Sequence, residues 1–381
     1  MRVQVTKGKF KKIRELNRRR NYFMKRLRYI LRILLVKTLW DKSGLSNVDL
    51  SSAKKVLLMR NEGTLGDAIV DSPLVKSLHD SGYIVDFLLS TSNRQIMQYN
   101  PNIRHIYETA NLDSESFLKN ITHNIPQETI KELANNQYDI VIDPSLFDMP
   151  AHRMLLLRQI NPKSVIGFNK WPCIKRYSKS FDFDALNNHV SDANHMIADY
   201  LGLNKEHIDN YEIYIPDDVH TEVNEYVEKI SGHKVVINIF ASNQDRSLSQ
   251  EQLLSIIARL QTDFPNIHII LLDHQNKITV PLPDKVTINP FRSLHHTMAL
   301  ISQADLVISP DTSIVHMAAT WRRPLIAIYR DIPTNNRLWA PGYAQARQIL
   351  IRSGKLHQQQ DIDSLIMAEL DPEWIATLKQ D

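Results

Sequence analysis

The chain has 381 residues, of which 43% are hydrophobic and 23% are charged. These values are typical of a globular protein and exclude a chain that is disordered throughout, and the length predicts two domains rather than one. The only cysteine, Cys173, excludes an intramolecular disulfide and any metal site made of several cysteines, so we expect a reducing, cytosolic compartment.

The charge is distributed unevenly along the chain, although the formal net charge is only +4. Residues 1–42 hold 15 basic residues against two acidic ones, a net charge of +13, which leaves 31 basic and 40 acidic residues, a net charge of −9, for the other 339. The sequence therefore predicts a mildly acidic body that carries a strongly basic N-terminal extension, residues 1–50.

Residues 22–40 of this extension contain neither glycine nor proline, and their apolar residues recur at steps of three and four, which predicts an amphipathic helix. Arg28 and Arg32 interrupt the apolar runs, which are too short for a membrane span or a signal peptide. Three roles remain open for the helix: binding at an anionic membrane surface, packing on a domain, and binding nucleic acid. We favour the membrane surface for residues 1–42, and the acidic body argues against nucleic acid.

From Lys55 onward, short apolar and β-branched runs alternate with helical stretches, a pattern typical of parallel sheets with crossover helices. The predicted strands are 55–59, 85–89, 139–142, 164–168, 235–240, 267–272, 306–308 and 325–328. The predicted helices are 72–79, 250–262, 294–302 and 313–320.

The alternation weakens between about residues 202 and 234, where a polar run precedes Pro216 and a charged helix at 218–229. We place a domain boundary there and predict two Rossmann-like domains, residues 51–205 and 206–381. A last helix, 362–378, is interrupted near Pro372. In open α/β sheets ligands bind at the carboxyl ends of strands, so the loops after the strands are where we expect the site.

The first of these loops is residues 60–67, in which Gly63 and Gly66 allow a tight turn before a helix begins. The loop lacks the three glycines of the dinucleotide motif and the Lys-Ser/Thr pair of the P-loop. Asp67 stands where a helix-capping residue would be, and a carboxylate at a strand end can equally act as a general base. Both interpretations remain open.

The second loop follows the predicted strand at 306–308 and leads into the helix at 313–320. Asp311, Thr312 and Ser313 place hydroxyl and N–H groups at the start of this helix, an arrangement that suits a diphosphate. His316 lies one turn further on the same face as Thr312. It is either a structural residue or a ligand-binding one.

Three motifs follow one another in the chain. The first is Leu65-Gly66-Asp67 with Pro73, and the second runs from Ala304 through Ala319 to Pro324. The third is a weaker K-x-W-P match, in which Arg246 takes the lysine position and Leu248 the tryptophan position. Together they resemble glycosyltransferase family 9, the lipopolysaccharide heptosyltransferases, over about residues 54–350.

The resemblance implies a GT-B fold, an α/β architecture with two Rossmann-like domains that face a cleft. It implies an inverting transfer that requires neither a metal nor another cofactor, with cleft closure bringing together groups from the two domains. The implied donor is a nucleotide-diphosphate sugar such as ADP-heptose, and the implied acceptor is the lipopolysaccharide or lipooligosaccharide core. The expected location is then the cytoplasmic face of the inner membrane of a Gram-negative bacterium.

The resemblance also implies roles for residues. Asp67 would deprotonate the acceptor hydroxyl, and Arg246 would hold the diphosphate. The remaining donor ligands would be Asp311, Thr312, Ser313 and His316. From their place in the first loop, Arg60 and Asn61 are expected near an anionic acceptor, although Arg60 could instead pair with Glu62. No metal ligands are expected, because no pair of histidines has a metal-binding spacing.

The chain departs from the family pattern at several positions. Ser313 replaces a glycine, and Arg330 stands where the family has a glycine after the last motif strand. We expect these changes to alter the donor pocket or to add a phosphate contact. They also leave open an alternative function, a degenerate family member that binds a nucleotide sugar or a glycolipid without turnover.

Overall fold

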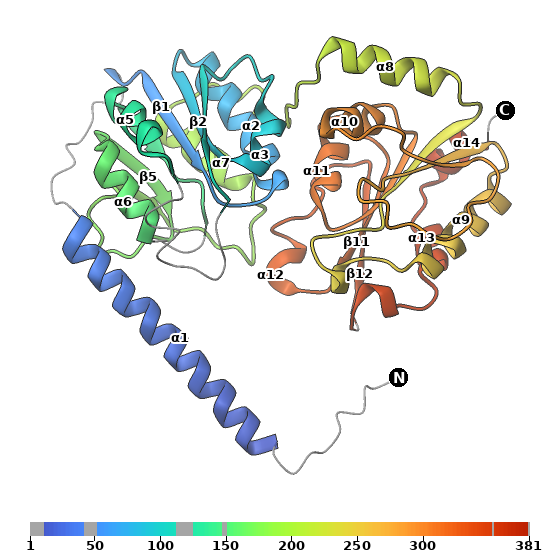
Figure 1. The fold of residues 1–381 in the computed structure, drawn as a ribbon, viewed down its shortest axis with the longest axis horizontal. Coiled ribbons are helices and arrows are strands. Elements are labelled where there is room, and N and C mark those ends of the chain that lie inside the picture. Colours follow the sequence, from blue (N-terminus) through green and yellow to red (C-terminus); the bar gives the residue numbers. More distant parts are fainter. Residues whose placement is uncertain (1–10, 42–51, 112–124, 147–150, 353, 380–381) are drawn as a thin grey trace.

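A computed structural model describes residues 11–41, 52–111, 125–146, 151–352 and 354–379. The body of the chain consists of two six-stranded parallel sheets with helices packed against their faces (Figure 1). The predicted α/β class is therefore confirmed. A long helix, α1, extends from the first half of the molecule.

The first sheet has the strand order β3-β2-β1-β4-β5-β6, and every pairing in it is parallel. Its strands are β1 (Lys55–Arg60), β2 (Ile84–Ser90), β3 (His105–Thr109), β4 (Ile140–Ile142), β5 (Ser164–Phe168) and β6 (Lys179–Phe181). Its helices are α2 (Leu65–Asp80), α3 (Thr91–Met97), α5 (Gln127–Asn135), α6 (Ala151–Ile160) and α7 (Asp192–Leu201).

The second sheet, read from its other edge, has the order β9-β8-β7-β10-β11-β12 and so repeats the topology of the first. Its strands are β7 (His233–Ile237), β8 (Ile267–Leu271), β9 (Val286–Ile288), β10 (Leu306–Pro310), β11 (Leu325–Arg330) and β12 (Ala346–Ile351). The helices of this half are α8 (Asp217–Glu228), α9 (Gln250–Asp263), α10 (Leu294–Ser302), α11 (Ser313–Thr320), α12 (Pro333–Asn336), α13 (Ile362–Ala368) and α14 (Pro372–Leu378). In each half the carboxyl ends of β-strands are where a ligand is expected to bind.

One apolar core runs through both halves. It contains residues of α2 and β2 from the first half together with residues of α10 and α11 from the second. Helix α2 contacts α11, and α3 contacts α10, so the two halves meet along these helices. Because their carboxyl-end loops face each other across this contact, the halves enclose a site between them.

The eight predicted strands all form, with ends that shift by up to three residues. The sequence did not predict β3, β6, β9 and β12, which are the four edge strands of the two sheets. Helix α2 begins at Leu65 rather than at residue 72, so Pro73 lies inside the helix and not at its start. The carbonyl of Ile69, which loses its helical partner at Pro73, accepts a hydrogen bond of 2.6 Å from the Ser72 hydroxyl instead.

Helix α1 (Lys11–Trp40) is longer than predicted and packs on the body only near its C-terminal end. Ile33 and Val36 are buried in an apolar cluster that also contains residues of α6. Tyr29 makes an edge-to-face contact with Trp171, with ring centroids 6.0 Å apart. Among the described residues, no helix is long and apolar enough to cross a membrane.

Candidate active site

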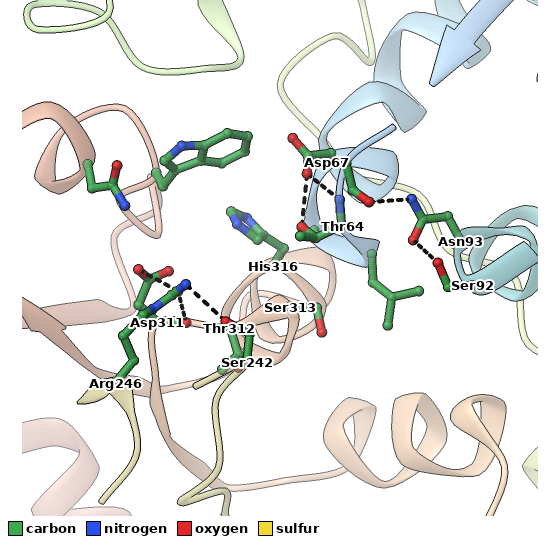
Figure 2. Close-up of a pocket in the computed structure, with 15 residues that line it drawn as sticks. Thr64, Asp67, Ser92, Asn93, Ser242, Arg246, Asp311, Thr312, Ser313 and His316 are labelled. Carbon is green, nitrogen blue, oxygen red and sulfur yellow. Dashed lines mark hydrogen bonds and ion pairs between the residues drawn. The ribbon is translucent and has the colours of Figure 1, made fainter. Parts of the chain in front are cut away.

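The loop after β1 ends in a cap that fixes the orientation of Asp67. One oxygen of this carboxylate, Oδ2, accepts hydrogen bonds from the backbone N–H of Thr64 at 2.6 Å and from the Thr64 hydroxyl at 2.9 Å (Figure 2). The other oxygen, Oδ1, lies 3.8 Å from Nη1 of Arg60. Asp67 thus caps α2 and still presents one oxygen to the space between the two halves.

That space is a central cavity of about 530 Å³. The first half contributes residues 63–67 with Ser92 and Asn93. The second half contributes Ser242, Arg246, Asp311, Thr312, Ser313, His316, Asn335 and Trp339. Six of the predicted site residues therefore line one cavity, with Asp67 on one side, Arg246 and Asp311 on the opposite side, and His316 between them (Figure 2).

Arg246 is fixed by Asp311. Its Nη2 lies 2.8 Å from the Asp311 carboxylate and also donates to the Asp311 backbone carbonyl, while Nη1 lies 3.4 Å from the Ser242 hydroxyl. Burial raises the pKa of Asp311, and Arg246 opposes this shift. Asp311 therefore orients the guanidinium, which remains partly exposed at the cavity wall.

Helix α11 begins at the cavity with Thr312 as its N-cap. The Thr312 hydroxyl accepts from the backbone N–H of Ile314 at 3.3 Å, and it also contacts Ser309 and Asn238. Thr312 is thus occupied in shaping the helix end, and Ser313 presents its side chain to the cavity. The positive end of the helix dipole at this position favours a bound anion.

His316 connects the two halves. A Cβ atom added to Gly66 on α2 would lie 2.8 Å from Cδ2 of His316, so the imidazole is in close contact with the helix backbone of the other half. The pKa of His316 is lowered to about 4, first by burial and then by the neighbouring His189, while Asp67 opposes the shift. The ring is therefore neutral near pH 7 and can act there only as a neutral hydrogen-bonding group.

A smaller inner cavity of about 230 Å³ adjoins the central one, and three residues, Gly63, Asp67 and Trp339, line both. Arg60 lines the inner cavity and is bound by Asp71 at 2.6 and 2.7 Å, so the alternative in which Arg60 pairs with Glu62 is not the pairing observed. Asn61 is buried and is not among the lining residues of either cavity.

The comparison with protein families gives one decisive match. The model of glycosyltransferase family 9 (heptosyltransferase) matches residues 127–366. The chain belongs to glycosyltransferase family 9. It is accordingly a glycosyltransferase.

Two curated relatives agree with this assignment. The chain is 28% identical over 310 residues to an Escherichia coli (strain K12) protein with the provisional name lipopolysaccharide heptosyltransferase 4, and the match covers 79% of this chain and 83% of that protein. It is 25% identical over 228 residues to the lipopolysaccharide core heptosyltransferase OpsX of Haemophilus influenzae, covering 54% of this chain and 62% of OpsX.

Solved structures agree in fold. A family 9 glycosyltransferase from Veillonella parvula superposes with a TM-score of 0.63 at 16% identity, over 88% of this chain and 97% of the other. Heptosyltransferase WaaC of E. coli with ADP gives 0.61 at 17% identity, over 84% and 99%. At these identities the likeness concerns the fold, and it confirms the predicted GT-B architecture.

In this family 9 enzyme a third cavity, of about 560 Å³, lies at the carboxyl ends of β7, β8 and β9. It shares five lining residues with the central cavity: Leu65, Ser92, Ser242, Thr312 and Ser313. Apart from Thr312 and Ser313, its lining residues were not predicted from the sequence, among them Asn238, Asp273 and Lys277. Each of these residues lies in the loop after a strand, and this position in the sequence was the signal that could have marked it as a candidate ligand-binding residue. Asp273 accepts from the backbone N–H groups of Lys277 and Ile278 at 2.9 and 2.7 Å and so shapes the loop.

Two further expectations concern Arg330 and metal ligands. Arg330 lines neither the central cavity nor the cavity at the strand ends. Its charge acts instead near Asp245, whose pKa is lowered first by Lys355 and then also by Arg330. In the part of the chain that the structure describes, no group of three or more His, Cys, Asp or Glu side chains is placed to hold a metal ion.

Proposed function

We propose that this enzyme transfers a heptose, with inversion, from ADP-heptose to the core of lipopolysaccharide or lipooligosaccharide. The observation that carries the proposal is the central cavity, which has the Asp67 carboxylate on one wall and Arg246 with the N-terminus of α11 on the other. The names of the two curated relatives support the sugar and the acceptor. The ADP of the WaaC structure supports the nucleotide.

Asp67 is the proposed general base. An acceptor hydroxyl next to Oδ1 would lose its proton to this oxygen while it attacks the anomeric carbon from the face opposite the leaving diphosphate. Because Asp67 lines both the central and the inner cavity, an acceptor in the inner cavity and a donor in the central one would meet at this carboxylate. The hydrogen bonds from Thr64 fix the other oxygen and keep Oδ1 in place.

Arg246 and the start of α11 are the proposed stabilisers of the leaving diphosphate. Negative charge grows on the diphosphate as the sugar–phosphate bond breaks, and a fixed guanidinium with helix N–H groups lowers the energy of that charge. These groups supply positive charge from the protein itself, and we therefore propose that the transfer needs no divalent ion. Asp311 orients Arg246, while Thr312, Ser313 and the neutral His316 would contact the phosphates or the sugar.

Helix α1 is the proposed tether to the cytoplasmic face of the inner membrane, where the acceptor lipid would be met. Leu16, Phe23, Leu27, Leu31 and Leu34 recur at helical spacing and are between 37% and 69% exposed. Exposed cations occur along the same stretch: Arg18, Arg20, Lys25, Arg26 and Arg28. This combination suits the interface of an anionic bilayer, with apolar side chains in the acyl boundary and cations at the head groups.

The function is tested by incubating the protein with ADP-heptose and truncated lipopolysaccharide, with EDTA present. Transfer is expected to persist in EDTA, and Asp67→Asn is expected to lower kcat by 10²–10⁴-fold, because the amide keeps the cap but cannot take a proton. Asp217→Asn is the matched control, since Asp217 is an exposed carboxylate in the first turn of α8. It should leave kcat unchanged.

Three results would count against the proposal. Full activity of Asp67→Asn would remove Asp67 as the base, and loss of activity in EDTA would contradict the metal-independent mechanism. Binding of several nucleotide sugars without transfer of any would favour the alternative of a degenerate family member.

A further inference from the structure

The inner cavity is distinguished by how closely the cations in its wall are compensated by carboxylates. It is lined by Arg60, Glu62, Gly63, Asp67, Pro144, Ser145, Leu146, Arg153, Val190 and Trp339. Two of these residues are cations, and each is already held by carboxylates. The balance of charge in and behind this wall determines which acceptors the cavity admits.

Arg60 is held by Asp71 through two short hydrogen bonds, and its remaining nitrogen, Nη1, faces Asp67 at 3.8 Å. Arg153 is almost completely buried and contacts Asp143 with Nη1 and Glu62, at 3.3 Å, with Nη2. In the described part of the chain, Arg60 and Arg153 are buried and each faces two carboxylates, whereas Arg246 of the central cavity is partly exposed and faces only Asp311. Neither guanidinium of the inner cavity is therefore available as an uncompensated charge for an incoming anion.

The groups behind the wall are paired as well. Lys170 lies 3.2 Å from Asp143, and the Tyr177 hydroxyl donates to the same carboxylate at 2.6 Å. Burial works to raise the pKa of Asp143 and of Glu62, but the positive charge of Arg153 and its neighbours holds both pKa values below the usual range. Both carboxylates are therefore ionised at neutral pH.

Among the described residues of this cluster, the cationic side chains of Arg60, Arg153 and Lys170 lie against the carboxyl groups of Glu62, Asp67, Asp71 and Asp143, and His152 makes a further contact with Glu62. A carboxylate or phosphate that entered would lose its hydration shell next to Glu62 and Asp67 and gain no unpaired cation. A neutral sugar meets no such penalty, because its hydroxyls can donate to carboxylates and accept from guanidinium groups.

Trp339 gives the cavity an aromatic wall at the junction with the central cavity. The chain around it is fixed to the first half on both sides: the backbone N–H of Val190 donates to the Leu338 carbonyl at 2.9 Å, and Nε2 of His189 donates to the Ala340 carbonyl at 3.0 Å. An aromatic face with a few planar polar groups is suited to the C–H face of a pyranose.

We infer that the inner cavity binds the terminal sugar of the acceptor and that this sugar is uncharged, a heptose or hexose rather than a carboxylated or phosphorylated residue. The inference rests on the proposed function and restricts the acceptor to those that end in an uncharged sugar. It also changes the expectation for Arg60, which orients Asp67 and contacts sugar hydroxyls instead of binding an anion.

The test compares core fragments that end in a neutral heptose or hexose with fragments that end in a carboxylated ulosonic acid or a heptose phosphate, all with ADP-heptose as donor. We expect kcat/KM to be at least 100-fold higher for the neutral termini. Saturation-transfer NMR with the corresponding free glycosides in the presence of ADP measures the same preference without turnover. Tighter binding or faster transfer of the charged fragments would overturn the inference.

Two variants examine the cause. Glu62→Gln removes one carboxylate from the wall and should raise the kcat/KM of the charged acceptors relative to the neutral ones about tenfold. An unchanged ratio contradicts the charge argument.

Trp339→Ala should raise the KM for the acceptor about tenfold, and Trp339→Phe should bring this KM most of the way back to the wild-type value. If no fragment of either kind is transferred but the neutral glycosides still bind, the proposed function fails and the inference stands. If no glycoside binds, the inference fails too.

Discussion

Gly66 and His316 lie in close contact across the two halves at the site. Alanine in place of glycine normally stabilises a helix by about 1 kcal/mol. Here the added Cβ would lie 2.8 Å from the imidazole of His316, which is buried and cannot move away freely. The glycine of the Leu65-Gly66-Asp67 motif is thus required by packing between the halves.

Gly66→Ala is therefore expected to destabilise the protein by about 1–3 kcal/mol, the range typical of overpacking. Urea unfolding of Gly66→Ala, His316→Ala and the double variant forms a cycle that isolates this contact. The cost of Gly66→Ala should largely disappear when His316 is alanine. Equal costs in both backgrounds would show that the contact is not the cause.

Asp67 illustrates how one residue serves both interpretations that the sequence left open. It caps α2 through one oxygen and presents the other to the cavities. Spacing could not decide between cap and base, because both require the carboxylate in the first turn. The base role itself stays a prediction.

At the level of single elements, helix α1 has two apolar faces. Ile33 and Val36 face the body, and the stripe that contains Leu31 and Leu34 faces solvent. The sequence showed apolar residues at helical steps but could not divide them between these faces. The division depends on α6, which covers only the last turns of α1.

The double variant Leu31→Gln/Leu34→Gln is expected to weaken binding to vesicles that contain phosphatidylglycerol by at least tenfold. Burying each exposed leucine in the membrane interface contributes on the order of 1 kcal/mol to the free energy of binding, and glutamine does not supply this contribution. Vesicle sedimentation measures the effect, and binding should also fall as salt is raised. Leu350→Gln, at a comparably exposed leucine of β12, is the control.

Unchanged sedimentation of the double variant would contradict the tether. If the wild-type chain instead forms a dimer that the double variant abolishes, the stripe pairs with a second copy of the chain.

The strands show where periodicity predicts well and where it does not. The predicted strands β5 and β10 are buried throughout, and each contains a run of β-branched or other apolar residues. The unpredicted strand β6 is only partly buried, and β12 alternates irregularly. An edge strand is covered on fewer sides, so its sequence carries a weaker apolar signal.

At the scale of the whole molecule, the two halves repeat one strand order and share a core through α2, α3, α10 and α11. The division at residues 205 and 206 stays a prediction.

Burial of His316 where the two halves meet makes the free energy of unfolding depend on pH. The ring is neutral in the folded protein and takes up a proton readily when the chain unfolds.

The folded pKa of His316, about 4, lies below the unfolded value of about 6.5. The neutral, buried His316 therefore contributes fully to the free energy of unfolding above about pH 6.5. As the pH falls toward 4, the free energy of unfolding decreases by about 3 kcal/mol in total from this residue. Urea unfolding between pH 7 and pH 4.5 should show a steeper loss for the wild type than for His316→Gln. Parallel curves for the two proteins would contradict this origin.

The sequence by itself determined the α/β class, the central strands of both sheets and six residues of one cavity, because buried strands and motif glycines are local patterns. It could not determine the partner of Arg60, the edge strands, the inner cavity or the place of Trp339. Each of these depends on groups that lie far apart in the chain and meet only when the two halves pack. Asp71, Asp143 and Arg153 are unremarkable in sequence, and only the tertiary structure brings their charges together behind the cavity wall.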